Sequence, residues 1–255
     1  MKALEVSGLE KNFGGVKAVN GFSLSVEEFE TVGIIGPNGA GKTTVFNLIS
    51  GLNRPTAGKI ALFSRDIAGL PTYRLAHLGL SRTFQNLRLF NSLSVRQNLM
   101  APILTKEGYG LAAALFRTRR FTRCERLAEY NAGILLEFFQ LSGKETWPAD
   151  SLPYGDQRKL ELARALAMSP RVLLIDEPGA GMNPREIQDL VRTLKAVKER
   201  FQLTIIVIEH QMGLIMNLSD RVVVMDFGQK ISEGTPAEVK KDRHVIKAYL
   251  GGEVV

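Results

Sequence analysis

The feature that most constrains this chain is the stretch of residues 36–44, which reads Gly-Pro-Asn-Gly-Ala-Gly-Lys-Thr-Thr. A glycine followed by four residues and then Gly-Lys-Thr is the pattern of a phosphate-binding loop. Its flanks fit, because residues 31–35 form a short apolar run and the apolar residues after Thr44 have helical spacing. The stretch therefore predicts an α/β fold in which a strand, this loop and a helix hold the phosphates of a nucleotide.

Each residue type in this loop has a physical reason to be there. Glycines let the backbone N–H groups approach phosphate oxygens closely. Lys42 can place its charge on the β and γ phosphates, and the Thr43 hydroxyl can ligate Mg²⁺. The candidate nucleotide-binding residues of the loop are Gly36, Pro37, Asn38, Gly39, Ala40, Gly41, Lys42, Thr43 and Thr44.

Polar residues follow two further apolar runs. Asp176 and Glu177 come directly after the run at 172–175, and His210 follows the run at 204–208. Ligands bind at the ends of strands in open α/β sheets. We therefore expect Asp176 to hold Mg²⁺ and Glu177 to polarise an attacking water. A lone histidine is usually a satisfied surface or core residue, but at this position His210 could sense the γ phosphate.

Composition excludes some classes of protein and leaves others open. The chain has 255 residues and one cysteine, Cys124, so it can form no internal disulfide. No stretch approaches the roughly 18 apolar residues of a membrane span, and we expect no signal peptide, so any membrane role should be peripheral. The net charge of +7 fits nucleic acid, anionic lipid or nucleotide partners, and equally a solvated basic surface.

The pattern along the chain changes after the first third. Residues 4–26 alternate as antiparallel strands do, whereas residues 87–165 are mostly helical in pattern. We expect one domain over 1–255, in which 1–86 and 166–255 form a core with a β subdomain and 87–165 form an inserted helical subdomain. The helical block carries an arginine cluster at positions 117, 119, 120, 123 and 126. A solvated helix face is the favoured interpretation, and a lipid-headgroup or partner contact is the alternative. The cluster lacks the aromatic interleaving that proteins use to stack nucleic-acid bases.

Together these motifs resemble the ATP-binding cassette (ABC) ATPases over essentially the whole chain. The resemblance implies an α/β P-loop fold with a RecA-like core, Mg²⁺-dependent ATP hydrolysis, and catalytic roles for Glu177, His210 and Lys42. It makes Phe13, otherwise a core or hairpin aromatic, an adenine-stacking residue. It also makes Gln85, otherwise an unassigned surface amide, a ligand of Mg²⁺ beside Thr43 and Asp176. Two further segments gain roles: the D-loop residues Gly181, Met182 and Asn183, and the signature residues Leu152, Pro153, Tyr154, Gly155, Asp156 and Gln157.

Family members work as head-to-tail dimers in which each ATP lies between one P-loop and the partner's signature helix. The resemblance thus implies a second ABC ATPase subunit, two membrane permeases, indirectly a solute-binding protein, no nucleic acid, and a place on the cytoplasmic face of the membrane. Two positions depart from the family pattern. Pro153 stands where a serine is common and offers neither hydroxyl nor N–H, and Asn183 stands where an aspartate is common.

Within the family, the ATPase subunits of branched-chain amino acid importers are the closer match. The resemblance is carried by five stretches: Arg-Thr-Phe-Gln at 82–85, Leu-Phe at 89–90, Tyr-Gly-Asp-Gln-Arg at 154–158, Ala-Gly-Met-Asn-Pro at 180–184 and the ending Val-Ile-Lys-Ala-Tyr-Leu-Gly at 245–251. Two alternatives stay open. The first is an ATPase of a lipid or lipopolysaccharide exporter, whose chain ends in a similar way. The second is a soluble ABC ATPase that acts on nucleic acid or ribosomes. Such proteins usually carry coiled coils, and this sequence has no sustained heptad repeat.

Overall fold

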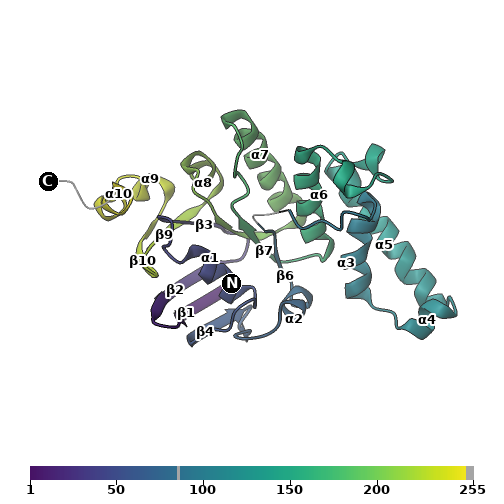
Figure 1. The fold of residues 1–255 in the computed structure, drawn as a ribbon, viewed down its shortest axis with the longest axis horizontal. Coiled ribbons are helices and arrows are strands. Elements are labelled where there is room, and N and C mark those ends of the chain that lie inside the picture. The colour runs from purple at the N-terminus through teal and green to yellow at the C-terminus, as the bar shows by residue number, and fades with distance from the viewer. Residues whose placement is uncertain (85–86, 251–255) are drawn as a thin grey trace. The chain divides into compact units, whose positions relative to one another are not determined.

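The computed structural model describes residues 1–84 and 87–250, and the chain forms two compact units. The first unit contains Met1–Gln85 and Arg171–Val255, and the second contains Asn86–Pro170. Figure 1 names the elements of both units. None of the helices within the described ranges combines the length and the apolar character needed to cross a membrane.

A six-stranded sheet forms the centre of the first unit. Its strands lie in the order β10-β9-β3-β8-β7-β6, and only β10 runs antiparallel to its neighbour. The bounds are β3 Thr31–Ile35, β6 Leu80–Arg82, β7 Val172–Asp176, β8 Thr204–Ile208, β9 Arg221–Asp226 and β10 Gln229–Gly234. Strands β3, β7 and β8 are buried along their whole length, which explains why they read as continuous apolar runs in the sequence.

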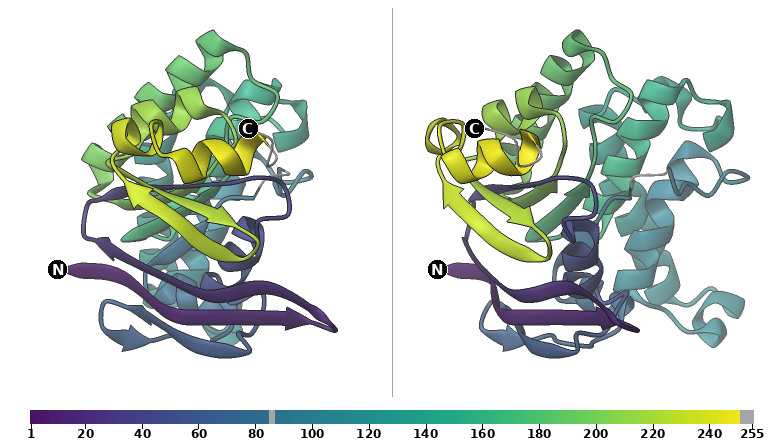
Figure 2. Two further views of the ribbon diagram at one scale, coloured as in Figure 1. Left: turned by 90° about the vertical axis from the view of Figure 1, so that its left-hand side faces the viewer. Right: turned by 60° about the vertical axis from the view of Figure 1, so that its left-hand side comes forward.

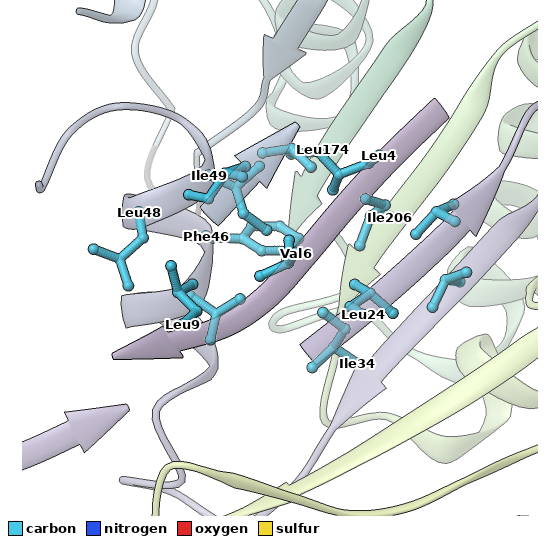
Figure 3. Packing of buried hydrophobic residues seen from close by; sticks show 14 of the residues in the cluster. Leu4, Val6, Leu9, Leu24, Ile34, Phe46, Leu48, Ile49, Leu174 and Ile206 are labelled. Atoms are coloured by element: carbon cyan, nitrogen blue, oxygen red, sulfur yellow. The ribbon is translucent and has the colours of Figure 1, made fainter. Parts of the chain in front are cut away.

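An antiparallel sheet of four strands in the order β2-β1-β4-β5 completes the first unit. Its strands are β1 Lys2–Phe13, β2 Val16–Glu27, β4 Ala57–Leu62 and β5 Arg65–Asp66. Residues Phe22, Leu24 and Val26 of β2 alternate inward, as the sequence pattern predicted. Figure 3 shows Leu4, Val6 and Leu9 of β1 packed around Phe46 with residues from the six-stranded sheet, so one apolar core joins the two sheets.

Helix α1, Lys42–Ile49, contributes Phe46 to this core. The other helices of the unit are α2 Thr72–His77, α7 Pro184–Phe201, α8 Met212–Leu218, α9 Pro236–Val239 and α10 Arg243–Leu250. After β9 the chain forms β10, α9 and α10. Figure 2 shows β10 and α10, in yellow, against each other, and β10 also lies beside β2.

The second unit is helical, as the pattern of residues 87–165 indicated. It contains α3 Val95–Glu107, α4 Leu111–Leu115, α5 Arg119–Phe138 and α6 Tyr154–Ala167, with short 3₁₀ turns at Ser142–Lys144 and Ala149–Ser151. Helix α3 begins with a capping box in which Ser94 and Gln97 satisfy each other's backbone N–H groups. Helices α5 and α6 pack on α3 and bury Leu135, Leu136 and Leu160.

Candidate active site

Three neighbouring parallel strands end at one edge of the six-stranded sheet. Strand β8 lies between β3 and β7. The P-loop follows β3, Glu209 and His210 follow β8, and β7 ends at Asp176 with Glu177 directly after it. Because parallel strands present their carboxyl ends together, the sheet brings the predicted phosphate loop, carboxylates and histidine to one place.

Two glycines of the P-loop are required by close backbone packing. Gly36 has φ 152°, and a Cβ atom there would lie 2.1 Å from the Met225 carbonyl oxygen. Gly41 has φ 96°, and its Cβ would lie 2.5 Å from the Ala18 carbonyl oxygen. Gly39 also has a positive φ, of 82°, but a Cβ there would meet nothing within 4 Å. Packing in this chain therefore accounts for Gly36 and Gly41, while Gly39 faces open space.

Lys42 is the first residue of α1 and its side chain is buried. Its ammonium donates hydrogen bonds to the carbonyls of Gly36, at 2.7 Å, and Pro37, at 2.9 Å. Burial lowers the Lys42 pKa, and the charges of Glu177 and Asp176 oppose that effect. The following Thr43 is exposed and Thr44 is half-buried, so the Thr43 hydroxyl is open to a ligand.

Asp176 forms a buried ion pair that the sequence did not reveal. Arg82 Nη2 donates to Asp176 Oδ2 at 2.7 Å, and both side chains are only 6% exposed. The other terminal nitrogen of Arg82 donates to Asn47 Oδ1 at 2.8 Å and to Ser50 Oγ at 2.9 Å, both on or next to α1. Arg82 thus links the end of β7 to the helix that carries the P-loop.

Glu177 and His210 are in direct contact. The distance from His210 Nε2 to Glu177 Oε1 is 2.7 Å. Glu177 has φ 45°, a left-handed conformation that non-glycine residues rarely adopt and that often marks functional sites. Its N–H is held by the carbonyl of Ile208, so the backbone fixes where this carboxylate lies.

Sequence reasoning missed Glu209, which organises the same edge. This carboxylate is buried and accepts hydrogen bonds from the N–H of Gly179, at 2.9 Å, and of His210, at 2.8 Å. Burial raises the Glu209 pKa, and these two hydrogen bonds oppose the rise. Gln211 adds a bond to the Gly179 carbonyl. A charged residue ending a fully apolar strand was the signal that could have identified Glu209.

The D-loop leads into α7 through an ordinary helix cap. Asn183 accepts hydrogen bonds from the N–H groups of Arg185 and Glu186, and Glu186 accepts one from the N–H of Asn183. This is a capping box, in which asparagine and aspartate serve about equally well. The departure from the family pattern at Asn183 therefore leaves the local structure intact. Gly181, with φ 76°, makes the preceding turn, and Met182 is half-buried.

A cavity of about 610 Å³ adjoins the P-loop. It is lined by Pro37, Asn38, Gly39, Ala40, Asp226, Phe227, Ile231, His244, Lys247 and Ala248. Tyr249 of α10 forms a hydrogen bond with the backbone of Gly36, so α10 approaches the same loop. Burial raises the Tyr249 pKa, and this hydrogen bond opposes the rise. Phe13, the predicted adenine-stacking residue, is not in the cavity lining. It is the last residue of β1, is 46% exposed, and has the Lys11 ammonium over its ring at 5.0 Å. Gln85 lies outside the described residues.

The signature segment belongs to the second unit. Pro153 caps α6, Leu152 is buried, and Gln157 donates to the Leu152 carbonyl at 2.8 Å. Asp156 is bonded to Lys144 and Lys159, and the Lys144 contact is the main cause of its lowered pKa. The exposed Tyr154 ring lies beside Arg158. A Cβ added at Gly155 would meet nothing within 4 Å, so packing in this chain does not require a glycine there.

The fold and the strand-end site define a P-loop ATPase of the ATP-binding cassette class. Comparison with known proteins agrees. The family model described as "ABC transporter" matches residues 19–180, and the model described as "Branched-chain amino acid ATP-binding cassette transporter" matches residues 229–255. The chain therefore belongs to the ABC transporter family, and it is an ATP-hydrolysing subunit of such a transporter.

Individual relatives and structures are similar over nearly their whole length. The chain is 45% identical to the high-affinity branched-chain amino acid transport ATP-binding protein BraF of Pseudomonas aeruginosa, with 97% of each chain covered. It is 41% identical to the LivG protein of Escherichia coli K12, also described as a high-affinity branched-chain amino acid transport ATP-binding protein, again over 97% of each. A crystal structure of a nucleotide-free ATP-binding cassette from an ABC transporter is 31% identical, with a TM-score of 0.84 over 98% of this chain and 100% of that one. A crystal structure of the ADP conformation of an ATP-binding cassette of an ABC transporter is also 31% identical, with a TM-score of 0.85 over 98% of this chain and 99% of that one.

Proposed function

We propose that this chain hydrolyses ATP to energise the import of branched-chain amino acids. The observation that carries the proposal is the contact between Glu177 and His210 at the edge of the sheet that also holds Lys42. The names of the relatives support leucine, isoleucine and valine as the transported class, rather than a lipid or a nucleic acid. The match at 229–255 supports the same assignment.

In this proposal Lys42 and the backbone of the P-loop hold the phosphates, with Phe13 stacked on the adenine. Glu177 is the general base: its fixed backbone aims the carboxylate at a water, and His210 orients the carboxylate. Glu209 positions His210 and the D-loop by binding one backbone N–H of each. The pair Glu177–His210 thus acts as one unit whose position depends on β7 and β8 together.

Oxygen donors of the kind that Mg²⁺ prefers are present at the site. The Asp176 carboxylate and the exposed Thr43 hydroxyl fit a cation that takes one or two protein oxygens and completes its shell with phosphates and water. Among the described residues, no group of three or more histidine, cysteine, aspartate or glutamate side chains could hold a metal ion by itself. We infer that these two residues, with Gln85, hold Mg²⁺, which neutralises charge on the transferred phosphate.

The signature segment serves the ATP of a partner chain in this proposal. Gly155 supports it, since nothing in its own chain requires a glycine there, and a glycine would permit a close approach by the partner's ATP. The partners would be a second ABC ATPase, two permeases and, through them, a solute-binding protein, on the cytoplasmic face of the membrane. The unit Asn86–Pro170 would be the helical subdomain, slightly longer than the predicted 87–165.

The experiment is uptake of labelled leucine by cells that lack this chain, complemented with variants. Wild type and the matched control Glu199→Gln, an exposed glutamate on α7, should restore uptake. Glu177→Gln should not restore uptake and should lower hydrolysis about 100-fold or more while ATP still binds. Leucine uptake that is unchanged when the chain is lost would refute the assigned substrate, and undiminished hydrolysis in Glu177→Gln would refute the assigned base.

A further inference from the structure

A hairpin in the second unit exposes apolar side chains at its tip. Helix α4 reads Leu-Ala-Ala-Ala-Leu and has no buried residue. The exposed fractions are 92% for Leu111, 78% for Leu115 and 75% for Phe116. Three large apolar side chains within six residues are an unusual concentration on a water-exposed surface, where such residues normally occur singly. Figure 1 shows α4 next to the N-terminal part of α5.

Arginines surround a hollow directly after this apolar tip. Arg117, Arg119, Arg123 and Arg126, with Thr122, line a cavity of about 370 Å³. Within the part of the chain that the structure describes, none of these four side chains makes a hydrogen bond or an ion pair. They are all exposed. The cluster therefore keeps its donors available for an anion from outside.

Contacts within the hairpin hold the tip and the arginines in place. Tyr109 packs edge-on against Phe121 at 4.9 Å, and Arg120 donates to the Gly108 carbonyl at 2.7 Å. Glu125, the one acidic residue among residues 108–126, accepts a hydrogen bond from the Tyr109 hydroxyl. That bond raises the Tyr109 pKa to about 12. The acidic group is thus engaged with Tyr109 and does not pair with the arginines.

We propose that this basic hairpin, defined by residues 108–126, binds the anionic headgroups of a phospholipid surface. Guanidinium groups match phosphate oxygens in a bidentate manner, and an apolar segment beside them fits the boundary between headgroups and acyl chains. A soluble anion would use the arginines but would leave Leu111, Leu115 and Phe116 unexplained. Nucleic acid could use the arginines and stack on the exposed Phe116, but it would leave the exposed Leu111 and Leu115 unexplained. The contact goes beyond the proposed transport function, because it ties this chain to the membrane directly and not only through permeases.

The test is co-flotation of the full-length chain with vesicles of neutral phosphatidylcholine, or of phosphatidylcholine mixed with phosphatidylglycerol. Wild type should bind the anionic vesicles and not the neutral ones, and salt should weaken the binding. Each arginine near an anionic surface contributes about fivefold in affinity. Arg119→Ala/Arg123→Ala should therefore bind about 25-fold more weakly, whereas the control Arg192→Ala/Arg200→Ala, two exposed arginines of α7, should bind as wild type does.

A second pair of variants separates the apolar contribution from charge. Leu115→Ser/Phe116→Ser should weaken vesicle binding at least tenfold, and Tyr73→Ser, at another exposed large side chain, should not. ATP hydrolysis by all these variants should match wild type, which shows that they fold.

Three outcomes would overturn the proposal. The first is equal binding to neutral and anionic vesicles. The second is an equal loss of vesicle binding in Arg119→Ala/Arg123→Ala and in the control Arg192→Ala/Arg200→Ala. The third is full retention of binding in Leu115→Ser/Phe116→Ser together with competition by inorganic phosphate, which would assign the arginines to a soluble anion.

Discussion

The ion pair between Arg82 and Asp176 allows the sharpest test of how the site is held together. The perturbation is Arg82→Met, which keeps an unbranched apolar chain and removes the charge. In the structure it deletes three hydrogen bonds, to Asp176, Asn47 and Ser50, at 2.7, 2.8 and 2.9 Å. It also leaves the Asp176 carboxylate, only 6% exposed, without its counterion.

The magnitude follows from burial. Removing one member of a buried ion pair costs about 3–5 kcal/mol, because the remaining charge is left uncompensated. We expect Arg82→Met to lower the free energy of unfolding by about 4 kcal/mol. Asp176→Asn alone leaves the guanidinium uncompensated and should cost about 3 kcal/mol. The double variant buries no charge at this point, so it should cost about 2–3 kcal/mol less than the sum of the singles.

The assay is guanidinium denaturation of the four proteins in buffer without nucleotide or magnesium. A matched cycle on the exposed pair Arg192 and Asp189 of α7, 3.3 Å apart, should give a coupling below about 1 kcal/mol. If the buried pair couples no more strongly than this surface pair, the inference that desolvation makes Arg82 essential is wrong. Should Arg82→Met fail to fold, Arg82→Gln replaces it in the cycle, because it also removes the charge but keeps an amide that can donate a hydrogen bond.

The remaining predictions concern backbone constraints and pH. Gly36→Ala should lower stability by about 1–3 kcal/mol, because its Cβ would meet the Met225 carbonyl at 2.1 Å, while Gly15→Ala, which meets nothing within 4 Å, should be neutral in the same thermal melts. Asn183→Ala should cost about 1 kcal/mol of unfolding free energy in denaturant titrations, and Asn183→Asp only a few tenths, because either side chain caps α7; equal losses would contradict the capping role. The raised pKa of Glu209 means that the folded state binds its proton more tightly, so stability should fall as pH rises from the ordinary glutamate pKa through the raised one. The unfolding temperature of Glu209→Gln, measured between about pH 4 and about pH 8, should not show that fall. An identical pH profile in wild type and Glu209→Gln would count against a raised pKa of Glu209 as its cause.

Some of the site could be predicted because its residues sit next to strands in the sequence. The P-loop, Glu177 and His210 each follow a fully apolar run, and parallel strands place their ends together. The contact of 2.7 Å between His210 and Glu177, 33 positions apart, follows from that rule once β7 and β8 are neighbours. The catalytic roles of these residues stay predictions, since geometry alone does not measure them.

Other parts of the structure depend on tertiary contacts that no local pattern encodes. Arg82 and Asp176 are 94 positions apart, and nothing near Arg82 in the sequence marks it as the partner of a carboxylate. Strand β10 was missed because most of its residues are polar and none of them is buried, so it lacks the apolar run of its neighbours. The capping role of Asn183 was missed although a signal was present, since Asn-Pro-Arg-Glu at 183–186 has the spacing of a capping box.

The charged groups at the strand ends of the candidate site have partners within the chain. Lys42 donates to two backbone carbonyls, Arg82 pairs with Asp176, and His210 contacts Glu177. A phosphate or metal that binds here must replace hydrogen bonds and ion pairs that these groups already make. The binding free energy is therefore the difference between the new contacts and those that they replace. Since Arg82 also holds Asn47 and Ser50, loss of its bond to Asp176 would leave it anchored to α1. Binding at the P-loop can therefore change the link between α1 and β7 without unfolding either element.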